Sequence, residues 1–366
     1  WSPDSTAVLY IQDKGGDENF LLYSVNVATC VETTLPPFEN TRVDIVGGSE
    51  SIRDKILVGL NNRAPQFHDV HLLNLTTGEL ELVYENNGYA GFVADDTLTL
   101  RMAMRQNEAG GSDYFDITDN VVADEPFKTT AMEDSLTTTP AGYNNDGSIL
   151  YWLDSRDRDT AALFAQDTRT GKRTLIAQDE RADISGTLAD KKTGEEIAYS
   201  VNYLKTEWTA LDEGIKDAFA WLDERLEGEF GVNSRTDDDQ TWIVWNDPVT
   251  APSQTFIYDR AAQTLTPFYV TRPELEGAPL QPMQPVELPA RDGLTLPSYL
   301  TLPPGCDPDA MGHPSAPVPM VLQVHGGPWA RDEYGFSSNV QWLANRGYAV
   351  LQVNFRGSTE IGKSVV

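Results

Sequence analysis

The sequence around residue 167 decides how most of the chain must fold. It reads Leu163-Phe164-Ala165-Gln166-Asp167-Thr168-Arg169-Thr170-Gly171, an alternating apolar strand that ends in an acidic residue and runs into a turn. Three other stretches share this layout, and their closing residues are Asn26, Asn74 and Asp259. These positions are separated by 48, 93 and 92 residues. The unit therefore recurs about every 46 residues, which predicts weaker copies near Asp119 and Asp212 and is typical of four-stranded propeller blades.

Short strands are expected inside each unit, because β-branched and aromatic residues alternate there and turn-forming residues precede them. They lie at residues 7–12, 55–59, 149–153, 196–201 and 241–245. A β-sandwich is the alternative, although a sandwich rarely keeps one period over such a length.

One segment departs from the strand pattern. Between residues 209 and 229 the apolar positions recur at steps of four and three, at Leu211, Ile215, Phe219, Leu222 and Leu226. This spacing predicts an amphipathic helix packed on the side of a blade.

A change of architecture comes after the last repeat. Six prolines between residues 267 and 289 predict a linker. Beyond it we expect a strand at 294–302, an apolar strand at 319–324, a helix at 336–345 and a second apolar strand at 348–355. The two apolar strands should be buried on both faces of a parallel sheet. Strand, helix and strand form a βαβ unit, so an α/β domain is expected to begin here.

The charge balance limits the classes of partner. The 366 residues include 27 Lys and Arg and 56 Asp and Glu, a formal net charge of −29. Such a surface repels nucleic acids and anionic membrane surfaces, so neither is expected as a partner. Two cysteines far apart, Cys30 and Cys306, predict neither a disulfide framework nor a zinc site. They slightly favour the cytoplasm and leave a periplasmic or secreted location open.

A glycine-rich turn carries the strongest chemical signal. Val324-His325-Gly326-Gly327-Pro328-Trp329 comes directly after the first apolar strand. Two glycines let the backbone approach a substrate closely, at the sheet edge where open α/β sheets bind their ligands. A backbone N–H there can donate to a developing oxyanion.

The stretches Gly326-Gly327-Pro328-Trp329-Ala330-Arg331-Asp332 and Asn354-Phe355-Arg356-Gly357-Ser358-Thr359 resemble the prolyl oligopeptidase family of serine peptidases, in its acylaminoacyl-peptidase-like branch. The resemblance implies a β-propeller of about seven blades, roughly six of them visible, followed by the first strands of an α/β-hydrolase domain. The domains would span residues 1–280 and 281–366. It also implies a peptidase that cleaves short peptides or N-terminal (acyl)aminoacyl units, with the propeller restricting substrate access and no cofactor.

The resemblance also implies the oxyanion residue: the Gly327 N–H would form part of the oxyanion hole, and Gly326 would support the turn. Trp329 and Arg331 follow this turn and Arg356 stands at the carboxyl end of a strand, so their positions make them candidates to line the substrate crevice. A packing aromatic and surface ion pairs are the alternatives for these three residues. His325 is not expected to be the triad histidine, because the triad of this fold runs Ser, Asp, His later in the chain. The sequence holds no Gly-x-Ser-x-Gly motif, and Ser358 is interpreted as a turn residue. This span therefore looks like the front part of an enzyme without its triad, and we expect it to be inactive alone.

The remaining polar clusters predict no metal site. His68 and His71 stand three apart on an expected strand and so face opposite sides. Residues 237–239, three aspartates, resemble a solvated turn. Peptide substrates are the expected partners. The sequence is compatible with an oligomer but does not predict the oligomeric state. Two alternatives stay open: a propeller that serves as a binding module beside a vestigial hydrolase segment, and an esterase on the same fold.

Overall fold

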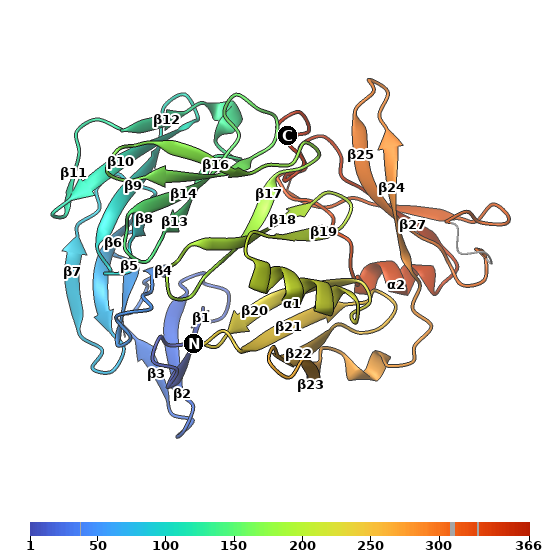
Figure 1. The fold of residues 1–366 in the computed structure, drawn as a ribbon, viewed down its shortest axis with the longest axis horizontal. Coiled ribbons are helices and arrows are strands. Elements are labelled where there is room, and N and C mark those ends of the chain that lie inside the picture. The colour runs from blue at the N-terminus through green and yellow to red at the C-terminus, as the bar shows by residue number, and fades with distance from the viewer. Residues whose placement is uncertain (37, 308–311, 328) are drawn as a thin grey trace. The chain divides into compact units, whose positions relative to one another are not determined.

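The computed structural model describes residues 1–36, 38–307, 312–327 and 329–366, and antiparallel sheets dominate it (Figure 1). The chain falls into two compact units. The first holds residues 1–156, 163–176 and 192–195, and the second holds residues 157–162, 177–191 and 196–366. The expected domain division near residue 280 stays a prediction.

Four small sheets belong wholly or mainly to the first unit, within the described residues. The first contains β1 (Ala7–Gln12), β2 (Leu21–Asn26) and β3 (Glu32–Leu35). The second contains β4 (Val43–Gly47), β5 (Lys55–Ala64), β6 (Phe67–Asn74) and β7 (Leu80–Tyr84). The third contains β8 (Gly91–Ala94), β9 (Leu100–Gln106), β10 (Ser112–Thr118), β11 (Val121–Val122) and β12 (Lys128–Thr130). The fourth contains β13 (Thr139–Tyr143), β14 (Ile149–Asp154), β15 (Ala162–Asp167) and β16 (Arg173–Ala177), and the short helix η1 (Met132–Asp134) precedes it.

The second unit contains two more sheets of the same kind and a different C-terminal sheet. The first of these is formed by β17 (Ile184–Ala189), β18 (Glu196–Asn202) and β19 (Thr206–Ala210), and helix α1 (Glu213–Asp223) comes after it. The next is formed by β20 (Glu229–Arg235), β21 (Thr241–Asp247), β22 (Gln254–Asp259) and β23 (Thr264–Val270), followed by η2 (Pro273–Leu275). The last sheet contains β24 (Met283–Pro289), β25 (Thr295–Thr301), β26 (Met320–Gln323) and β27 (Ala349–Val353), with helix α2 (Ser338–Ala344).

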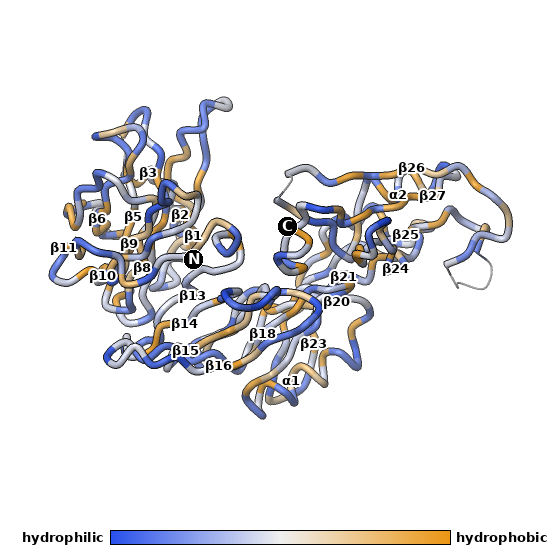
Figure 2. The backbone as a smooth tube through the Cα atoms, turned by 90° about the horizontal axis from the view of Figure 1, so that it is seen from above, coloured by the Kyte–Doolittle hydropathy of each residue, from blue (hydrophilic) through white to orange (hydrophobic). Residues whose placement is uncertain are grey.

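Successive sheets of the first unit share hydrophobic cores, because alternate side chains of a strand point to opposite faces. On β5, Val58 packs with Leu22 of the first sheet, whereas the neighbouring Leu57 packs with Phe115 of the third. Hydrophobic segments run along many strands (Figure 2), and in β5 the consecutive residues Ile56, Leu57 and Val58 are apolar because both faces of the strand are buried. Small antiparallel sheets that pack in chain order are the blades of a propeller, as the sequence predicts.

The repeat has a structural cause at the end of its strands. The sheets after the first begin at residues 43, 91, 139, 184 and 229, at intervals of 48, 48, 45 and 45 residues. At the end of each repeated strand, a side-chain oxygen accepts hydrogen bonds from backbone N–H groups two or three residues further on. The acceptors are Asn26, Asn74, Asp167 and Asp259. Asn and Asp recur because their short side chains close this turn.

The two weaker copies also lie where the period predicts. Asp119 lies between β10 and β11 with a φ of 50°. The carboxylate of Asp212 accepts from the N–H groups of Gly214 (2.8 Å) and Ile215 (3.2 Å). Here the same motif caps helix α1. This helix stands in the sequence where the blades made of β4–β7, β13–β16 and β20–β23 have their fourth strand.

Helix α1 confirms the expected amphipathic segment, although it is shorter than residues 209–229. Ile215, Phe219 and Leu222 are buried in a core that includes Trp242 of β21. Leu211 precedes the helix and is exposed.

The C-terminal sheet has the strand order β24-β25-β27-β26. Strands β26 and β27 are parallel, with Leu322 opposite Leu351, and α2 connects them. The expected βαβ unit is therefore confirmed. The expected linker is shorter than residues 267–289, because Pro267 lies in β23 and Pro285 in β24. Both are edge strands, where a missing N–H costs no ladder bond.

The expectation that both apolar strands are buried on two faces is wrong for β26. Met320, Leu322 and Val324 are all more than half exposed. The exposed side chains alternate along the chain and therefore share one face of the sheet, which the described residues leave uncovered. Strand β27, by contrast, is largely buried.

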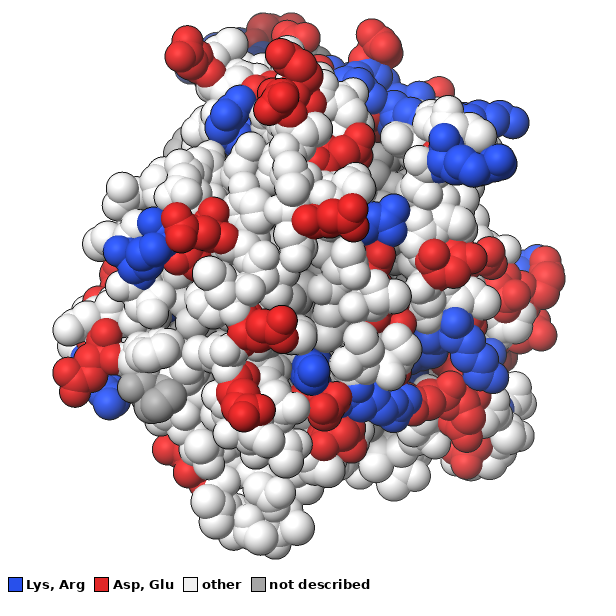
Figure 3. Space-filling model, turned by 90° about the vertical axis from the view of Figure 1, so that its left-hand side faces the viewer, with Lys and Arg blue, Asp and Glu red and all other residues white. Residues whose placement is uncertain are grey.

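Charged residues of both signs are scattered over the face shown in Figure 3, among larger uncharged areas. No described helix is long and apolar enough to cross a membrane. The described residues also contain no group of three His, Cys, Asp or Glu side chains that could hold a metal ion. Nε2 of His68 lies 3.3 Å from a carboxylate oxygen of Asp44, and Nδ1 of His71 lies 3.1 Å from the carbonyl oxygen of Asp69. Among the three aspartates at 237–239, Asp239 is not simply solvated, because two arginines, at positions 235 and 260, both pair with it.

Candidate active-site turn

Strands β26 and β27 are parallel, so their carboxyl ends lie at the same edge of the sheet. His325, Gly326 and Gly327 come after β26, and the residues from Asn354 to Ser358 come after β27. Open α/β sheets bind ligands at this edge. The predicted glycine turn therefore stands where the chemistry of such a fold takes place.

Gly327 adopts a backbone conformation that a side chain would not tolerate. Its φ is 132°, and a Cβ built on it would lie 2.7 Å from the backbone nitrogen of Trp329. Around Gly326 the same construction meets nothing within 4 Å. No described residue accepts a hydrogen bond from the Gly327 N–H. Pro328, part of the predicted motif, lies outside the described residues.

His325 joins this turn to the loop after β27. Its Nε2 lies 2.8 Å from Oγ of Ser358, and its Nδ1 lies 2.8 Å from the carbonyl oxygen of Gly326. The imidazole ring also stacks on Phe355, with ring centroids 4.4 Å apart and planes 16° apart. Ser358 is fully buried. The histidine is thus held on three sides and fixes the orientation of the peptide that precedes Gly327.

The contacts of His325 with Ser358 and Phe355 form one clamp on the turn, and a second clamp lies at Asp332, five residues beyond Gly327. The Asp332 N–H donates to Oδ1 of Asn354 (2.7 Å), and Nδ2 of Asn354 donates back to the Asp332 carbonyl (3.0 Å). Nε2 of Gln352 donates to the Asp332 carboxylate at 2.8 Å. Burial raises the pKa of this carboxyl, whereas the Gln352 hydrogen bond acts in the opposite direction. Together the two clamps fasten both ends of residues 325–332 to β27 and its loop.

Arg331 links the turn to the neighbouring blade of the same unit. Its guanidinium donates to the backbone carbonyls of Asn202 and Tyr203, to the latter at 2.9 Å, and its side chain is 4% exposed. Nη1 also lies 3.9 Å from a carboxylate oxygen of Glu360. Arg331 is therefore engaged with the backbone of the propeller segment.

The other crevice candidates differ from Arg331. Trp329 is 63% exposed and offers an open ring directly after the turn. Arg356 pairs with Asp292 and is half exposed. A substrate contact by any of the three stays a prediction.

Sequence reasoning missed the roles of Ser358, Asp332 and Asn354. Ser358 does lie in a turn, since its N–H donates to the Phe355 carbonyl, but its hydroxyl also holds His325. The His325–Ser358 contact spans 33 residues, and no local pattern announces such a pairing.

The comparisons with known proteins agree with this architecture. Residues 334–364 match the model of the prolyl oligopeptidase family. Dipeptidyl aminopeptidase BIII of Pseudoxanthomonas mexicana is 48% identical over 364 residues, and Dipeptidyl peptidase family member 6 of Caenorhabditis elegans is 30% identical over 396 residues. Each match covers 99% of this chain and 53% of the relative, so the chain spans about half the length of these relatives.

Solved structures show the same fold at low sequence identity. A puromycin-hydrolyzing peptidase of Mycobacterium tuberculosis has a TM-score of 0.69 and 14% identity, over 98% of this chain and 59% of that one. A puromycin hydrolase has a TM-score of 0.63 and 16% identity, over 98% and 57%.

Fold and site define a β-propeller joined to the opening strands of an α/β-hydrolase sheet, with a glycine turn at the carboxyl edge of that sheet. The family match at residues 334–364 and the two relatives show that the chain is similar to proteins of the prolyl oligopeptidase family. The acylaminoacyl-peptidase-like branch stays a prediction, and both relatives carry dipeptidyl names instead.

Proposed function

We propose that these residues are part of a serine peptidase that removes short N-terminal units, above all dipeptides, from peptides. The observation that carries the proposal is the Gly327 turn, whose backbone conformation requires glycine and which two clamps hold at the carboxyl edge of the sheet. The 48% identity to a dipeptidyl aminopeptidase supports the choice of dipeptides over single residues.

The chemistry assigned to the turn is charge stabilisation. A serine oxygen would bond to the scissile carbonyl carbon, its proton would pass to a histidine, and the carbonyl oxygen would become an oxyanion. The Gly327 N–H would donate to that oxyanion. The proton on the histidine would then pass to the departing amine, and water would release the acyl unit by the same steps in reverse.

The nucleophile, the base and the acid that orients the base would come from outside residues 1–366, since these hold no Gly-x-Ser-x-Gly motif. His325 is not a candidate base, because the hydroxyl at its Nε2 belongs to Ser358, which is fully buried, and its Nδ1 meets a backbone carbonyl instead of a carboxylate.

The test uses the full-length protein with a fluorophosphonate probe and with 4-nitroanilides of single amino acids, dipeptides and acylated amino acids. We expect labelling of one serine and release of intact dipeptides, identified by mass spectrometry. Absence of labelling would contradict a serine hydrolase and favour the binding-module alternative. Turnover of 4-nitrophenyl esters without any anilide would favour an esterase.

Gly327→Ala probes the turn itself. The added Cβ cannot fit, so the N–H should lose its alignment, and kcat should fall by about 10²–10³-fold, the usual cost of one oxyanion donor. The matched control is Gly326→Ala, because the space around Gly326 is open. Equal losses in both variants would contradict a specific role for the Gly327 N–H.

A further inference from the structure

The blade formed by β17, β18 and β19 has three described strands, whereas the blades made of β4–β7, β13–β16 and β20–β23 have four. Helix α1 comes after β19 where a fourth strand would stand, and a helix pairs its backbone groups internally. Strand β19 therefore keeps an edge that the helix does not pair.

The register shows which backbone groups point away from β18. The Leu211 N–H donates to the Ile197 carbonyl, and residues of an antiparallel pair alternate between bonded and non-bonded positions. Thr209 and Glu207 therefore bond to β18, whereas Thr206, Trp208 and Ala210 face outward. At Thr206 the outward N–H donates to a carboxylate oxygen of Glu229 (2.6 Å). Among the described residues, nothing pairs with the outward N–H and C=O groups of Trp208 and Ala210.

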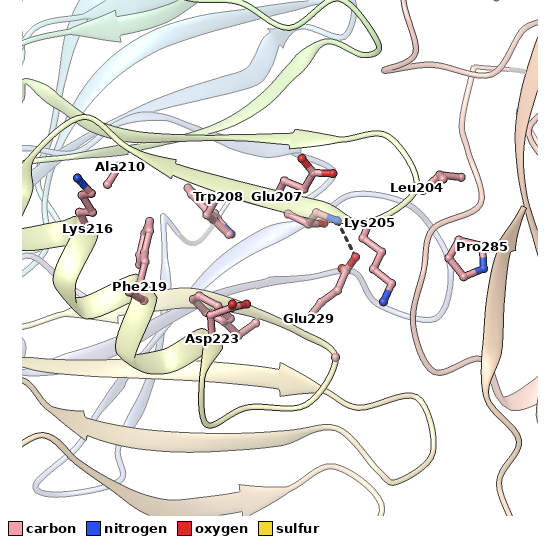
Figure 4. A pocket seen from close by; sticks show the side chains of 14 residues that line it. Leu204, Lys205, Glu207, Trp208, Ala210, Lys216, Phe219, Asp223, Glu229 and Pro285 are labelled. Atoms are coloured by element: carbon pink, nitrogen blue, oxygen red, sulfur yellow. Dashed lines mark hydrogen bonds between the residues drawn. The ribbon is translucent and has the colours of Figure 1, made fainter. Parts of the chain in front are cut away.

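These outward groups border a groove of about 680 Å³ (Figure 4). One wall is the edge of β19, and α1 supplies the facing wall through Lys216, Phe219, Ala220 and Asp223. The rings of Trp208 and Phe219 lie 5.6 Å apart, and Phe219 lies 5.9 Å from Phe230. The volume is in the range of ligand sites, and the groove joins apolar rings to a row of backbone donors and acceptors.

One end of the groove is formed by residues that stand next in the chain to those holding Arg331 of the active-site turn. Leu204 and Lys205 line its end, directly after the two carbonyls that Arg331 binds. Arg331 itself stands four residues beyond Gly327. An extended peptide whose scissile bond lies at Gly327 could therefore continue towards β19.

We propose that this groove binds the distal, C-terminal part of a peptide substrate as an added strand on β19. Backbone groups of the peptide would pair with Trp208 and Ala210, and every second side chain would meet the aromatic wall. The proposal rests on the proposed peptidase function. It adds a site for substrate residues well beyond the scissile bond.

The test compares substrates of increasing length on the full-length protein. Each begins with the dipeptide that profiling selects and continues into Thr-Val-Lys-Val-Thr-Val, truncated stepwise from its carboxyl end. We expect KM to fall at least tenfold from the shortest to the longest peptide while kcat changes little. A KM that does not depend on length would overturn the proposal.

Two variants and one matched control locate the effect. Ala220→Trp fills the groove from an exposed position on α1, and Asp217→Trp places the same ring on an exposed position of the helix that does not line the groove. Ala210→Pro removes one outward N–H without touching the ladder to β18. Ala220→Trp and Ala210→Pro should abolish the length dependence, and Asp217→Trp should keep it. All four proteins should cleave dipeptide anilides at one rate, which shows that each is folded. Length dependence that survives Ala220→Trp would also overturn the proposal.

A binding experiment separates this inference from the proposed function. Fluorescein-labelled Thr-Val-Lys-Val-Thr-Val needs no cleavage, so its fluorescence polarisation reports on the groove alone. Saturable binding that Ala220→Trp weakens at least tenfold and Asp217→Trp does not would support the groove, even if no serine is labelled. No binding to an active peptidase would refute the groove and leave the peptidase in place.

Discussion

At the residue scale, the buried polar side chains near the turn act on the backbone. Ser358 and Asn354 are fully buried, and each holds one end of the segment that contains Gly327. A buried hydroxyl without a hydrogen-bond partner would destabilise the fold, so the buried Ser358 needs His325 as its partner. The consequence is a turn whose N–H direction is set by groups that need not touch substrate.

Ser358→Ala tests this positioning role. Losing one hydrogen bond of about 0.5–1.5 kcal/mol should let His325 and the Gly326 peptide shift, and kcat of the full-length protein should fall about twofold to tenfold. KM for a dipeptide anilide should stay unchanged, because the hydroxyl is buried. Ser364→Ala is the matched control, since Ser364 bonds to Asp159 and not to the turn. A rise in KM alone would argue against positioning.

A second buried cluster concerns stability. Three cations surround the Asp154 carboxylate, with Lys128 at 3.2 Å, Arg156 at 2.8 Å and Arg173 at 2.6 Å. Nζ of Lys128 also lies 3.3 Å from the ring centroid of Trp152. Burial lowers the pKa of Lys128 from 10.5 to about 7, although Asp154 acts in the opposite direction. Hydrogen bonds from Arg156 and the positive charges of Lys128 and Arg173 outweigh burial and keep the pKa of Asp154 well below its usual range.

The Lys128 shift predicts a pH dependence of stability. Between pH 7 and 10.5 the unfolded chain keeps a proton that folded Lys128 has released. The unfolding free energy should therefore rise with pH in this window. Lys128→Met should lose that rise, whereas Lys172→Met, at an exposed position, should keep it. Thermal melting of the 366-residue chain and both variants at pH 7 and 9.5 measures the difference. Parallel changes in all three proteins would contradict the lowered pKa.

At the element scale, the Asn or Asp side chain that closes the repeated strands leads to two different structures. After most third strands it closes a hairpin, and after β19 the Asp212 carboxylate caps a helix. The difference lies in the next residues of the chain, since Ile215, Phe219 and Leu222 are spaced to bury one helical face. Because that helix replaces a fourth strand, the edge of β19 stays exposed.

Asp212→Ala should destabilise the second unit by about 0.5–2 kcal/mol, the usual cost of removing an N-cap. Asp217→Ala, in the middle of the same helix, controls for the loss of a carboxylate. Urea denaturation followed by tryptophan fluorescence is a suitable measurement, because Trp208 and Trp242 pack against Phe219. Equal destabilisation by both changes would show that the cap has no special role.

Elements with strong local patterns were predictable from the sequence. The strand at residues 7–12 matches β1, and the residue 149–153 strand matches β14 to within one residue. The glycine turn was predictable as well, since His-Gly-Gly-Pro follows an apolar strand and opens a βαβ unit that comes after a propeller. The His325–Ser358 pair and the Arg331 contacts with residues 202 and 203 were not, because they depend on how distant segments meet. The exposure of β26 also depends on whether other segments cover its face, which hydropathy alone does not report.

At the scale of the whole molecule, the chain combines a repeat with a sheet of another kind. Within the first unit, successive blades bury their faces against one another and so form their own cores. The sheet after residue 283 leaves the apolar side chains of β26 exposed within the described chain. An exposed apolar edge strand is a pairing surface for other chains.

The last prediction concerns residues 1–366 expressed alone. They should neither hydrolyse dipeptide anilides nor react with a fluorophosphonate probe. An oxyanion donor stabilises charge that only nucleophilic attack creates, and the serine of the His325–Ser358 pair beside the turn is fully buried. Residues 281–366 should also be cleaved first in limited proteolysis, because β26 leaves apolar surface uncovered. Activity assays with Gly327→Pro as the blank, together with mass spectrometry of the proteolytic fragments, provide the measurement. Turnover above the blank, or labelling of Ser358, would show that this span carries a nucleophile of its own.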